Sequence, residues 1–283
     1  MDIAIVTDVE HLTGTENDRL LVPALAARGL VARTVAWDDD TMDWSLPRLS
    51  VIRATWDYHL RREEFMAWAE RASALTSLWS PIATLRWNTH KGYLRDLTAR
   101  GVRTVPTIWL FQGEHADLAE MMEREGWSAA VVKPAISASA YATQMVTRER
   151  LAAGQAHLDE LLAGRDMMIQ PYLASVVTAR ERSLVYLDGQ LTHTFLRAPA
   201  LVHGTTEAWN RNILAANDPE EDAFARHALS CLEQPPLYAR VDLVYDDDGA
   251  LRLMELELVE PSLGLELAPW AAERFADAIA ARL

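Results

Sequence analysis

Three acidic side chains near the end of the sequence have the types and spacing to bind a divalent cation. Glu255 and Glu257 alternate within the apolar run LMELELV, so both would point to one face of a β-strand. Asp242 lies in the preceding run, YARVDLVY, which residues 246–249 would join to the first as a hairpin. Carboxylates that repel each other select hard cations such as Mg²⁺ or Mn²⁺, with phosphate as a favoured further ligand. The same alternation also fits a half-exposed strand with an acidic outer face.

Basic residues could supply the positive charge that a phosphate requires. Lys133 ends the apolar strand AAVVKP, and the small residues 137–140 after it would let backbone N–H groups approach phosphate oxygens. Lys91 is predicted on a helix, and Arg240 would share a strand face with Asp242. Each has an ordinary alternative, because surface lysines are common and an arginine beside an acid can be a plain salt bridge.

The first part of the chain alternates strands and helices, which is typical of an open α/β sheet. Strands are predicted at residues 1–7, 31–37 and 50–55, and helices at 17–28 and 62–78. Open α/β sheets bind ligands at the carboxyl ends of their strands. The candidates for substrate contacts there are Asp8, Arg53, Asp57 and Tyr58. Arg53 and Asp57 could instead simply pair with each other.

The remainder of the chain is predicted to be α+β, because it contains antiparallel hairpins. The predicted elements are a helix at 87–100, strands at 105–111, 129–134 and 167–173, a hairpin of 182–187 with 190–196, strands at 237–245 and 251–259, and a helix at 269–283. The hairpin would turn at Asp188-Gly189. Residues 199–218 are irregular and polar, so they are predicted to be mobile or to face the substrate.

Composition limits the class of protein. The chain has 283 residues, half of them hydrophobic, which is enough for roughly two globular domains. No apolar run reaches the roughly 18 residues of a membrane span, and the N-terminus is predicted to be a buried strand, not a signal peptide. The single cysteine, Cys231, excludes an internal disulfide, and the scattered histidines predict no histidine metal site. A net charge of −14 argues against unspecific nucleic-acid binding, and a cytoplasmic location is expected.

In order and spacing, these features resemble the ATP-grasp superfamily over nearly the whole chain. The segments RATWDYH, LRWNTHKGYL, VVKPAISASAY, YARVDLV and LMELELVEPSLGLELAP look like the subgroup of the cycloserine synthetase, which closes O-ureido-D-serine to D-cycloserine with ATP. D-alanine–D-alanine ligase and glutathione synthetase are more distant relatives. The resemblance implies an ATP-grasp fold with an α/β N-terminal domain at 1–86, a central subdomain at 87–172 and a metal-binding C-terminal subdomain at 173–283. Residues 105–172 would close as a lid.

The resemblance also implies a role for each residue that matches a family motif. The implied ATP-binding residues are Lys91, Lys133, Ser137, Ser139, Gln170, Tyr172, Leu173 and Glu181. Among them, the lysines would hold the phosphates, residues 170–173 would contact the adenine edge, and Glu181 would bond the ribose hydroxyls. The implied Mg²⁺ ligands are Asp242, Glu255 and Glu257. Arg240 and Lys133 would be catalytic, and Arg197 would add positive charge near the substrate.

The sequence departs from the family pattern at two places in the site. The loop ISASAY contains no glycine, although this loop is usually glycine-rich, and Glu257 occupies a metal position that is often asparagine. The stretch THTFLRAPALVHGTTEAWNRNILA also differs from the cycloserine subgroup, which leaves the substrate open.

The function expected from these residues is that of a ligase or cyclo-ligase that uses ATP and Mg²⁺, or Mn²⁺, on a small amino-acid-like molecule through an acyl phosphate. Two alternatives share the ATP contacts: a nucleotide-binding sensor or partner protein without chemistry, and a small-molecule kinase. Relatives are often dimers or larger, so a homo-oligomer is possible by analogy.

Overall fold

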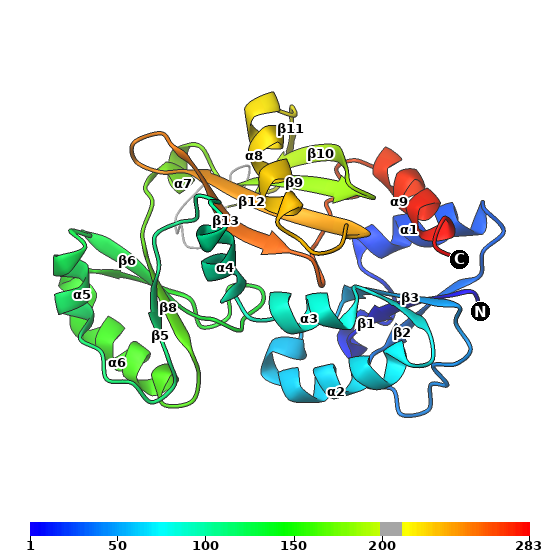
Figure 1. The fold of residues 1–283 in the computed structure, drawn as a ribbon, viewed down its shortest axis with the longest axis horizontal. Helices are drawn as coiled ribbons and strands as arrows, with labels where there is room; N and C mark the ends of the chain where they lie inside the picture. The colour runs from blue at the N-terminus through cyan, green and yellow to red at the C-terminus, as the bar shows by residue number, and fades with distance from the viewer. Residues whose placement is uncertain (199–210) are drawn as a thin grey trace.

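The computed structural model describes residues 1–198 and 211–283, which form three sheets (Figure 1). The first sheet is parallel, in the order β2-β1-β3-β4, and is covered by two helices. Its elements are β1 (Ile3–Thr7), α1 (Glu16–Ala26), β2 (Ala32–Ala36), β3 (Leu49–Ala54), α2 (Arg62–Ser73) and β4 (Ser77–Trp79). Strands β1 and β3 are buried along their whole length, as expected for a parallel sheet covered on both faces.

The last helix of the chain, α9 (Trp270–Ala280), returns to this first sheet. Helix α1 begins with a capping box between Thr15 and Asp18, and its apolar face packs against α9, where Leu25 and Phe275 are both fully buried. The two helices lie side by side near the chain termini (Figure 1). The N-terminal and C-terminal parts therefore share one core.

The second sheet forms a separate lobe with its own core. Its elements are β5 (Ile108–Leu110), α5 (Leu118–Arg124), β6 (Ala129–Pro134), β7 (Gln144–Thr147), α6 (Leu151–Leu162) and β8 (Met167–Pro171). The strand order is β5-β8-β6-β7, and every pair is antiparallel. Helix α6 crosses β7 so closely that the Cβ of an alanine at Gly154 would come 2.5 Å from a methyl group of Val146.

The third sheet is antiparallel, in the order β11-β10-β9-β12-β13. Its strands are β9 (Arg182–Leu187), β10 (Gln190–Leu196), β11 (Ile213–Ala215), β12 (Tyr238–Tyr245) and β13 (Leu251–Glu257). The helices of this part of the chain are α3 (Ile82–Asn88), α4 (Tyr93–Ala99), α7 (Ser175–Thr178) and α8 (Pro219–Ser230). Asp188 and Gly189 both have positive φ angles in the β9–β10 turn, which confirms the predicted tight hairpin.

Three sequence predictions about elements are wrong. The helix predicted at 87–100 is split into α3 and α4 by a turn, since Thr89 Oγ1 donates to Leu85 O at 2.6 Å and the Lys91 N–H donates to Ala135 O at 2.8 Å in the second lobe. The helix predicted at 62–78 ends at Ser73, because the residues after it form β4 beside β3. Part of the segment 199–218 that was predicted to be irregular is β11, and residues 199–210 lie outside the described residues.

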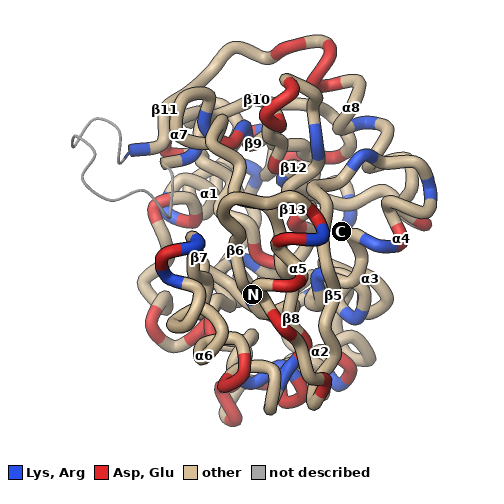
Figure 2. The backbone as a smooth tube through the Cα atoms, turned by 90° about the vertical axis from the view of Figure 1, so that its left-hand side faces the viewer, with Lys and Arg blue, Asp and Glu red and all other residues tan. Residues whose placement is uncertain are grey.

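The three sheets lie within the predicted domain ranges 1–86, 87–172 and 173–283, a division that stays a prediction. Acidic and basic residues are interspersed along all three parts (Figure 2), so positive charge for an anionic ligand must be gathered locally. Among residues 1–198 and 211–283, no helix is long and apolar enough to cross a membrane.

Candidate active site

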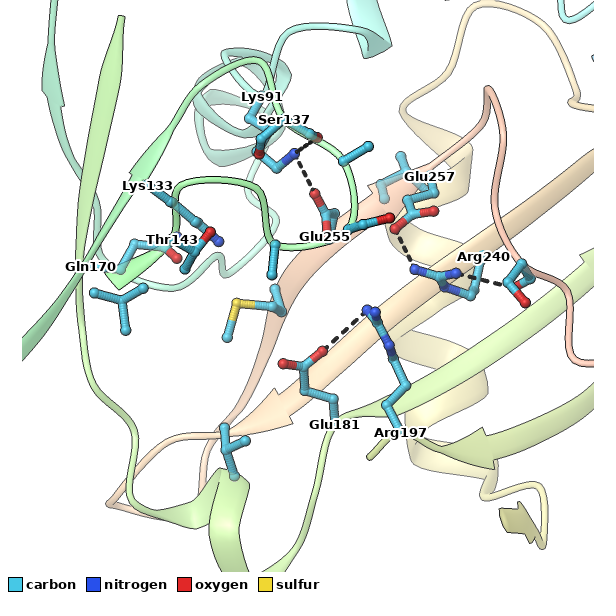
Figure 3. Close-up of a pocket in the computed structure, with 18 of the residues that line it drawn as sticks. Lys91, Lys133, Ser137, Thr143, Gln170, Glu181, Arg197, Arg240, Glu255 and Glu257 are labelled. Atoms are coloured by element: carbon cyan, nitrogen blue, oxygen red, sulfur yellow. Dashed lines mark hydrogen bonds and ion pairs between the residues drawn. The ribbon is translucent and has the colours of Figure 1, made fainter. Parts of the chain in front are cut away.

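One cavity of about 380 Å³ collects most of the residues that the sequence singled out (Figure 3). Residues of β6 and β8 in the second lobe face residues of β12 and β13 across it, and Trp56 and Tyr58 of the N-terminal part complete the wall. Its volume falls within the roughly 300–1,000 Å³ typical of small-molecule sites. The cavity is therefore the candidate active site.

The three acids come together as the strand pattern predicted: Glu255 and Glu257 line the cavity, and Asp242 lies next to them without lining it. Arg240 pairs with Glu257 and Asp242 with Glu255 in the register of β12 and β13. One carboxylate oxygen of each acid lies within 4.8 Å of the others, and Asp242 is fully buried. Three hard oxygen donors this close together are suited to a divalent cation.

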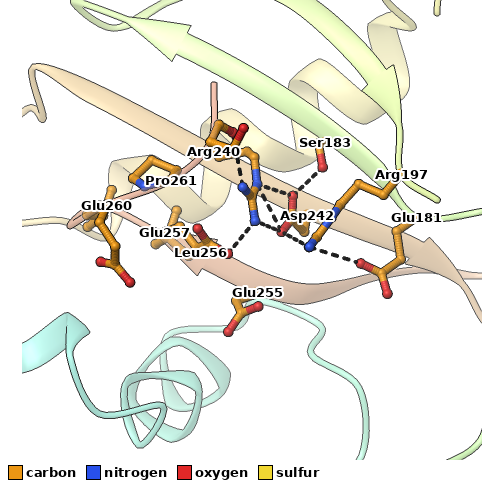
Figure 4. A network of polar contacts seen from close by, with 12 residues as sticks. Glu181, Ser183, Arg197, Arg240, Asp242, Glu255, Leu256, Glu257, Glu260 and Pro261 are labelled. Carbon is orange, nitrogen blue, oxygen red and sulfur yellow. Dashed lines mark hydrogen bonds and ion pairs between the residues drawn. The ribbon is translucent and has the colours of Figure 1, made fainter. Parts of the chain in front are cut away.

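Each of these acids already has a cationic partner (Figures 3 and 4). Lys91 Nζ lies 2.8 Å from Glu255, and Arg240 Nη2 lies 2.9 Å from Asp242 and also contacts Glu257. A further cation, Arg197, contacts Asp242 at 3.1 Å. The negative charge of the acid cluster is thus offset by Lys91, Arg197 and Arg240, which line the same cavity.

The charges shift the pKa values of this cluster in opposite directions. Burial favours a neutral Glu255, but Lys91 and Lys133 outweigh it and lower the pKa of Glu255 to about 2. Burial raises the pKa of Glu257 to about 7, although Arg240 opposes the shift. Burial likewise opposes the charge on Lys91, yet the carboxylate of Glu255 raises the pKa of that lysine.

Lys133 lies beside this cluster on β6 and points into the cavity (Figure 3). Burial lowers the pKa of Lys133, and no hydrogen bond or ion pair of its ammonium group is found within the described residues. Lys91 differs, because its Nζ also donates to Ser137 O at 2.8 Å. One lysine is thus paired across the cavity, and the other remains available to a ligand.

The loop after β6 adopts a backbone that usually requires glycine. Ser139, Ala140 and Ala142 have φ angles of 49°, 56° and 52°, in the left-handed region. Ser137, Ser139 and Ala140 line the cavity. The absence of glycine, noted in the sequence, has therefore not prevented a tightly curved loop here, although each such residue costs about 1–2 kcal/mol.

The far end of the cavity is lined by residues of the predicted hinge. Gln170, Tyr172 and Leu173 follow one another there, and Gln170 Nε2 donates to Thr107 Oγ1 at 2.9 Å. Glu181 also lines the cavity, and burial raises its pKa although Arg197 lies 3.5 Å away. The apolar side chains that line this end are Val131, Leu173, Val176 and Met254.

The predicted substrate residues divide into two groups. Tyr58 and Arg197 line the cavity, whereas Asp8, Arg53 and Asp57 do not. The Arg53 guanidinium is 2% exposed, donates to Pro261 O at 3.0 Å and lies 3.5 Å from Asp18.

The pairing of Arg53 with Asp57 that the sequence left open is therefore wrong. Asp57 accepts from Trp37 Nε1 at 2.9 Å and lies 3.7 Å from Arg61. Asp8 accepts from the Trp56 N–H at 3.1 Å. Asp8 and Arg53 thus support the wall from outside the cavity, because Trp56 lines the cavity and Pro261 lies between two lining residues.

Several cavity residues were not identified from the sequence, and the polar ones among them include Trp56, Asn88, Tyr93, Thr143, Glu260 and Ser262. Asn88 is bound to the edge of β13, since it donates to Leu256 O and accepts from the Leu258 N–H, both at 2.8 Å. Glu260 could have been noticed as one more acid directly after the alternating run, but nothing in its spacing indicates which way it points.

Comparisons with known proteins agree with this geometry. A family model described as the N-terminal domain of D-cycloserine synthetase DcsG matches residues 3–80. Cycloserine biosynthesis protein DcsG of Streptomyces lavendulae is 34% identical over 294 residues, which cover 99% of this chain and 98% of that protein. The crystal structure of D-cycloserine synthetase DcsG has a TM-score of 0.90 at 32% identity and covers 100% of this chain and 99% of that one.

More distant structures share the fold. A RimK-domain ATP-grasp protein from Sphaerobacter thermophilus has a TM-score of 0.72 at 20% identity, covering 99% of both chains. D-alanine–D-alanine ligase from Bacillus anthracis, complexed with ATP, has a TM-score of 0.70 at 16% identity, covering 99% of this chain and 96% of that one.

Fold and site together define an ATP-grasp enzyme, an ATP-dependent ligase that forms a C–N bond. Within this class, the chain belongs to the D-cycloserine synthetase family. ATP-grasp ligases in general use ATP and a divalent metal ion, and a cycloserine synthetase acts on small molecules.

Proposed function

We propose that this enzyme activates the carboxylate of a small amino-acid-like molecule as an acyl phosphate and captures it with a nitrogen of the same molecule. By the family resemblance, the proposed substrate is O-ureido-D-serine, whose ureido nitrogen would attack the acyl phosphate, close the ring and release phosphate. The carbamoyl group left on that nitrogen would then be lost to water as CO₂ and ammonia, which gives D-cycloserine. The observation that carries the proposal is that Lys91, Lys133, Glu255 and Glu257 line one cavity, with the third acid, Asp242, directly beside the two glutamates.

The residues present fit both ATP and a divalent cation. Asp242, Glu255 and Glu257 would hold Mg²⁺, or Mn²⁺, since their oxygens are hard ligands already gathered within 4.8 Å. Lys91, Lys133 and the curved loop with Ser137 and Ser139 would hold the phosphates. Bound ATP would supply the phosphoryl group that turns a carboxylate oxygen into a leaving group, while the cation offsets its charge.

The nucleoside end of the proposed ATP site lies among residues 170–173. Their main chain, with apolar side chains around it, would bind the adenine edge, and Glu181 beside them would accept hydrogen bonds from the ribose. This places Lys133 and the acids at the phosphate end of the same cavity. Arg240 would then stabilise the oxyanion that forms when the nitrogen attacks, because its guanidinium is fixed between Asp242 and Glu257.

The second lobe carries Lys133 and the loop after it, so its position decides whether the cavity is closed. Closure would exclude water, which otherwise hydrolyses an acyl phosphate.

A direct experiment incubates the purified protein with ATP, Mg²⁺ and a panel that contains O-ureido-D-serine, and follows released phosphate and product mass. We expect phosphate release with a cyclised product, and a loss of at least about 100-fold in the Lys133→Ala and Glu255→Ala variants. Variants that release phosphate as fast as the wild type would show that the site is misplaced. A phosphate ester would indicate a kinase, and tight ATP binding without turnover would indicate a binding protein.

A further inference from the structure

The segment after β13, residues 258–263, is fixed by side chains from many parts of the chain. Each of its six successive carbonyl oxygens accepts a hydrogen bond from a different side chain. The donors, in order, are Ser80, Tyr238, Trp56, Arg53, Arg240 and His193. Backbone carbonyls in a loop more commonly face water or other backbone groups, so this segment is held with unusual rigidity.

Glu260 is the only ionisable residue of this segment. The carbonyl oxygen of Glu260 accepts a hydrogen bond from Trp56 Nε1 at 3.0 Å. The residue after Glu260 is a proline, which restricts the backbone of Glu260 to extended conformations. Its carboxylate therefore projects from a fixed point of the chain. It projects into the cavity, which it lines together with Trp56, Tyr58 and Ser262.

The carboxylate of Glu260 has no hydrogen bond or ion pair within the described residues. The neighbouring acids differ, because Asp242 and Glu257 are paired with arginines (Figure 4) and Glu255 is paired with Lys91 (Figure 3). Burial, with the negative charge of Glu257 in addition, raises the pKa of Glu260 to about 8. A half-buried carboxylate that faces other acids is unfavourable unless something in the cavity compensates it.

Glu260 also lies away from the proposed nucleotide. In Figure 4 it stands at one end of the polar network, and Glu181, the proposed ribose contact, stands at the other end, with Arg240 and Glu257 between them. A ligand group at Glu260 would therefore lie on the side of Arg240 that ATP does not occupy, where a second substrate is expected.

We propose that Glu260 is a specificity-determining residue that binds the ammonium group of the amino-acid substrate. This inference rests on the proposed function and names the chemistry that its substrate must carry. An ammonium group supplies the missing positive charge and donates hydrogen bonds to the carboxylate, while the substrate carboxylate is directed to Arg240 and the phosphate end. A cavity built in this way selects a zwitterion over a simple carboxylic acid.

The test compares O-ureido-D-serine with its des-amino analogue, 3-(ureidooxy)propanoate, in the wild type and in Glu260→Gln at pH 8.5. We expect the change to raise KM for O-ureido-D-serine by about 10- to 100-fold, with a smaller change in kcat, because a hydrogen bond to a charged group is lost. KM for ATP and kcat/KM for the analogue should stay within about twofold. Glu63→Gln, which removes the same charge from an exposed position on α2, is the matched control.

Calorimetric binding of both compounds, with a non-hydrolysable ATP analogue and Mg²⁺ present, separates this inference from the proposed function. The ammonium site is supported if the wild type binds O-ureido-D-serine more tightly than the des-amino analogue and Glu260→Gln does not. This result would hold even if no phosphate is released and the proposed reaction is wrong. The ammonium site is overturned if Glu260→Gln loses affinity for both compounds to the same extent. It is also overturned if the wild type binds both compounds with equal affinity. A reduced Mn²⁺ stoichiometry in Glu260→Gln also overturns it, because Glu260 would then be a metal ligand.

Discussion

The ammonium group of Lys91 lies 2.8 Å from Glu255 Oε1 and also donates to Ser137 O at 2.8 Å. One side chain thus connects the loop after β6 with strand β13 across the cavity. The proposed roles of these residues imply an exchange of partners, because Lys91 is assigned to ATP phosphates and Glu255 to the metal. Without nucleotide, the lysine occupies the place of a cation, and metal binding should be weak until phosphates draw the lysine away.

Replacing Lys91 by methionine should therefore have opposite effects on metal and nucleotide. We expect Mn²⁺ alone to bind about tenfold more tightly, equivalent to about 1.4 kcal/mol, because Glu255 loses its partner. ATP should bind more weakly in the same variant. Electron paramagnetic resonance of free Mn²⁺ and calorimetry with ATP would measure the two affinities. Lys133→Met is the comparison, since that lysine is unpaired in the described structure. Its loss should lower the affinity for ATP and raise the affinity for Mn²⁺ less than Lys91→Met does. An unchanged Mn²⁺ affinity in Lys91→Met would exclude the exchange.

Glu181 should give the enzyme its preference for ribose over deoxyribose. We expect Glu181→Ala to raise KM for ATP about tenfold, from the loss of hydrogen bonds to a charged acceptor, and to remove most discrimination against 2′-deoxy-ATP. Steady-state kinetics with both nucleotides would measure the ratio. If KM rose to the same extent for both nucleotides in the variant, the ribose assignment would be wrong. Glu181 would then act through Arg197, its ion-pair partner at 3.5 Å.

The half-buried carboxyl group of Glu260 should make stability depend on pH. Its pKa rises from 4.5 to about 8 on folding, so between these values the folded state binds more protons than the unfolded state. Stability is then undiminished below the unfolded pKa and falls as pH rises through the folded pKa. Relative to the wild type, Glu260→Gln should gain unfolding free energy between about pH 5 and 8, by up to about 1.4 kcal/mol per pH unit.

Urea unfolding of both proteins without ligands, at pH 4, 6 and 8, would measure this difference. It should be close to zero at pH 4 and level off above about pH 8. A difference that does not depend on pH would mean that the carboxyl group has an ordinary pKa.

The close contact between α6 and β7 predicts compensation between two mutations. Gly154→Ala should destabilise the protein by about 1–3 kcal/mol, because the added methyl group would meet Val146, which is fully buried and β-branched. Val146→Ala alone should cost about 2 kcal/mol through the cavity it leaves. The double variant should be more stable than the sum of both changes implies, by at least about 1 kcal/mol in denaturant unfolding. Strict additivity would show that the two residues do not share this space.

The sequence predicted best what depends on local periodicity. The period of two in LMELELV placed Glu255 and Glu257 on one face, and the register of β12 and β13 confirms that Asp242 lies opposite Glu255. Much of the site was accessible because many of its residues lie in recognisable strands, such as Lys133 in β6 and Gln170 in β8. The family resemblance then gave the order in which these elements meet.

The sequence could not predict what depends on contacts between distant segments. Lys91 is in a turn because its N–H reaches Ala135 in another lobe, and no local pattern reports that contact. Arg53 pairs with Asp18 rather than the nearby Asp57, since the strand directs its side chain into the interior. The direction of Glu260 is set by six donors that span most of the chain, so only the assembled structure could identify it.

The polypeptide enters and leaves the second lobe at a single place. Its first and last strands are antiparallel neighbours, with Ile108 opposite Ile169, so the chain enters and leaves side by side. The hydrogen bond from Gln170 to Thr107 ties these two crossings together. Such a lobe would rotate as a rigid body about one hinge. A base bound near Gln170 would sit at the axis and hardly move, whereas Lys133 and its loop, farther out, would travel with each opening and determine when the phosphates are released.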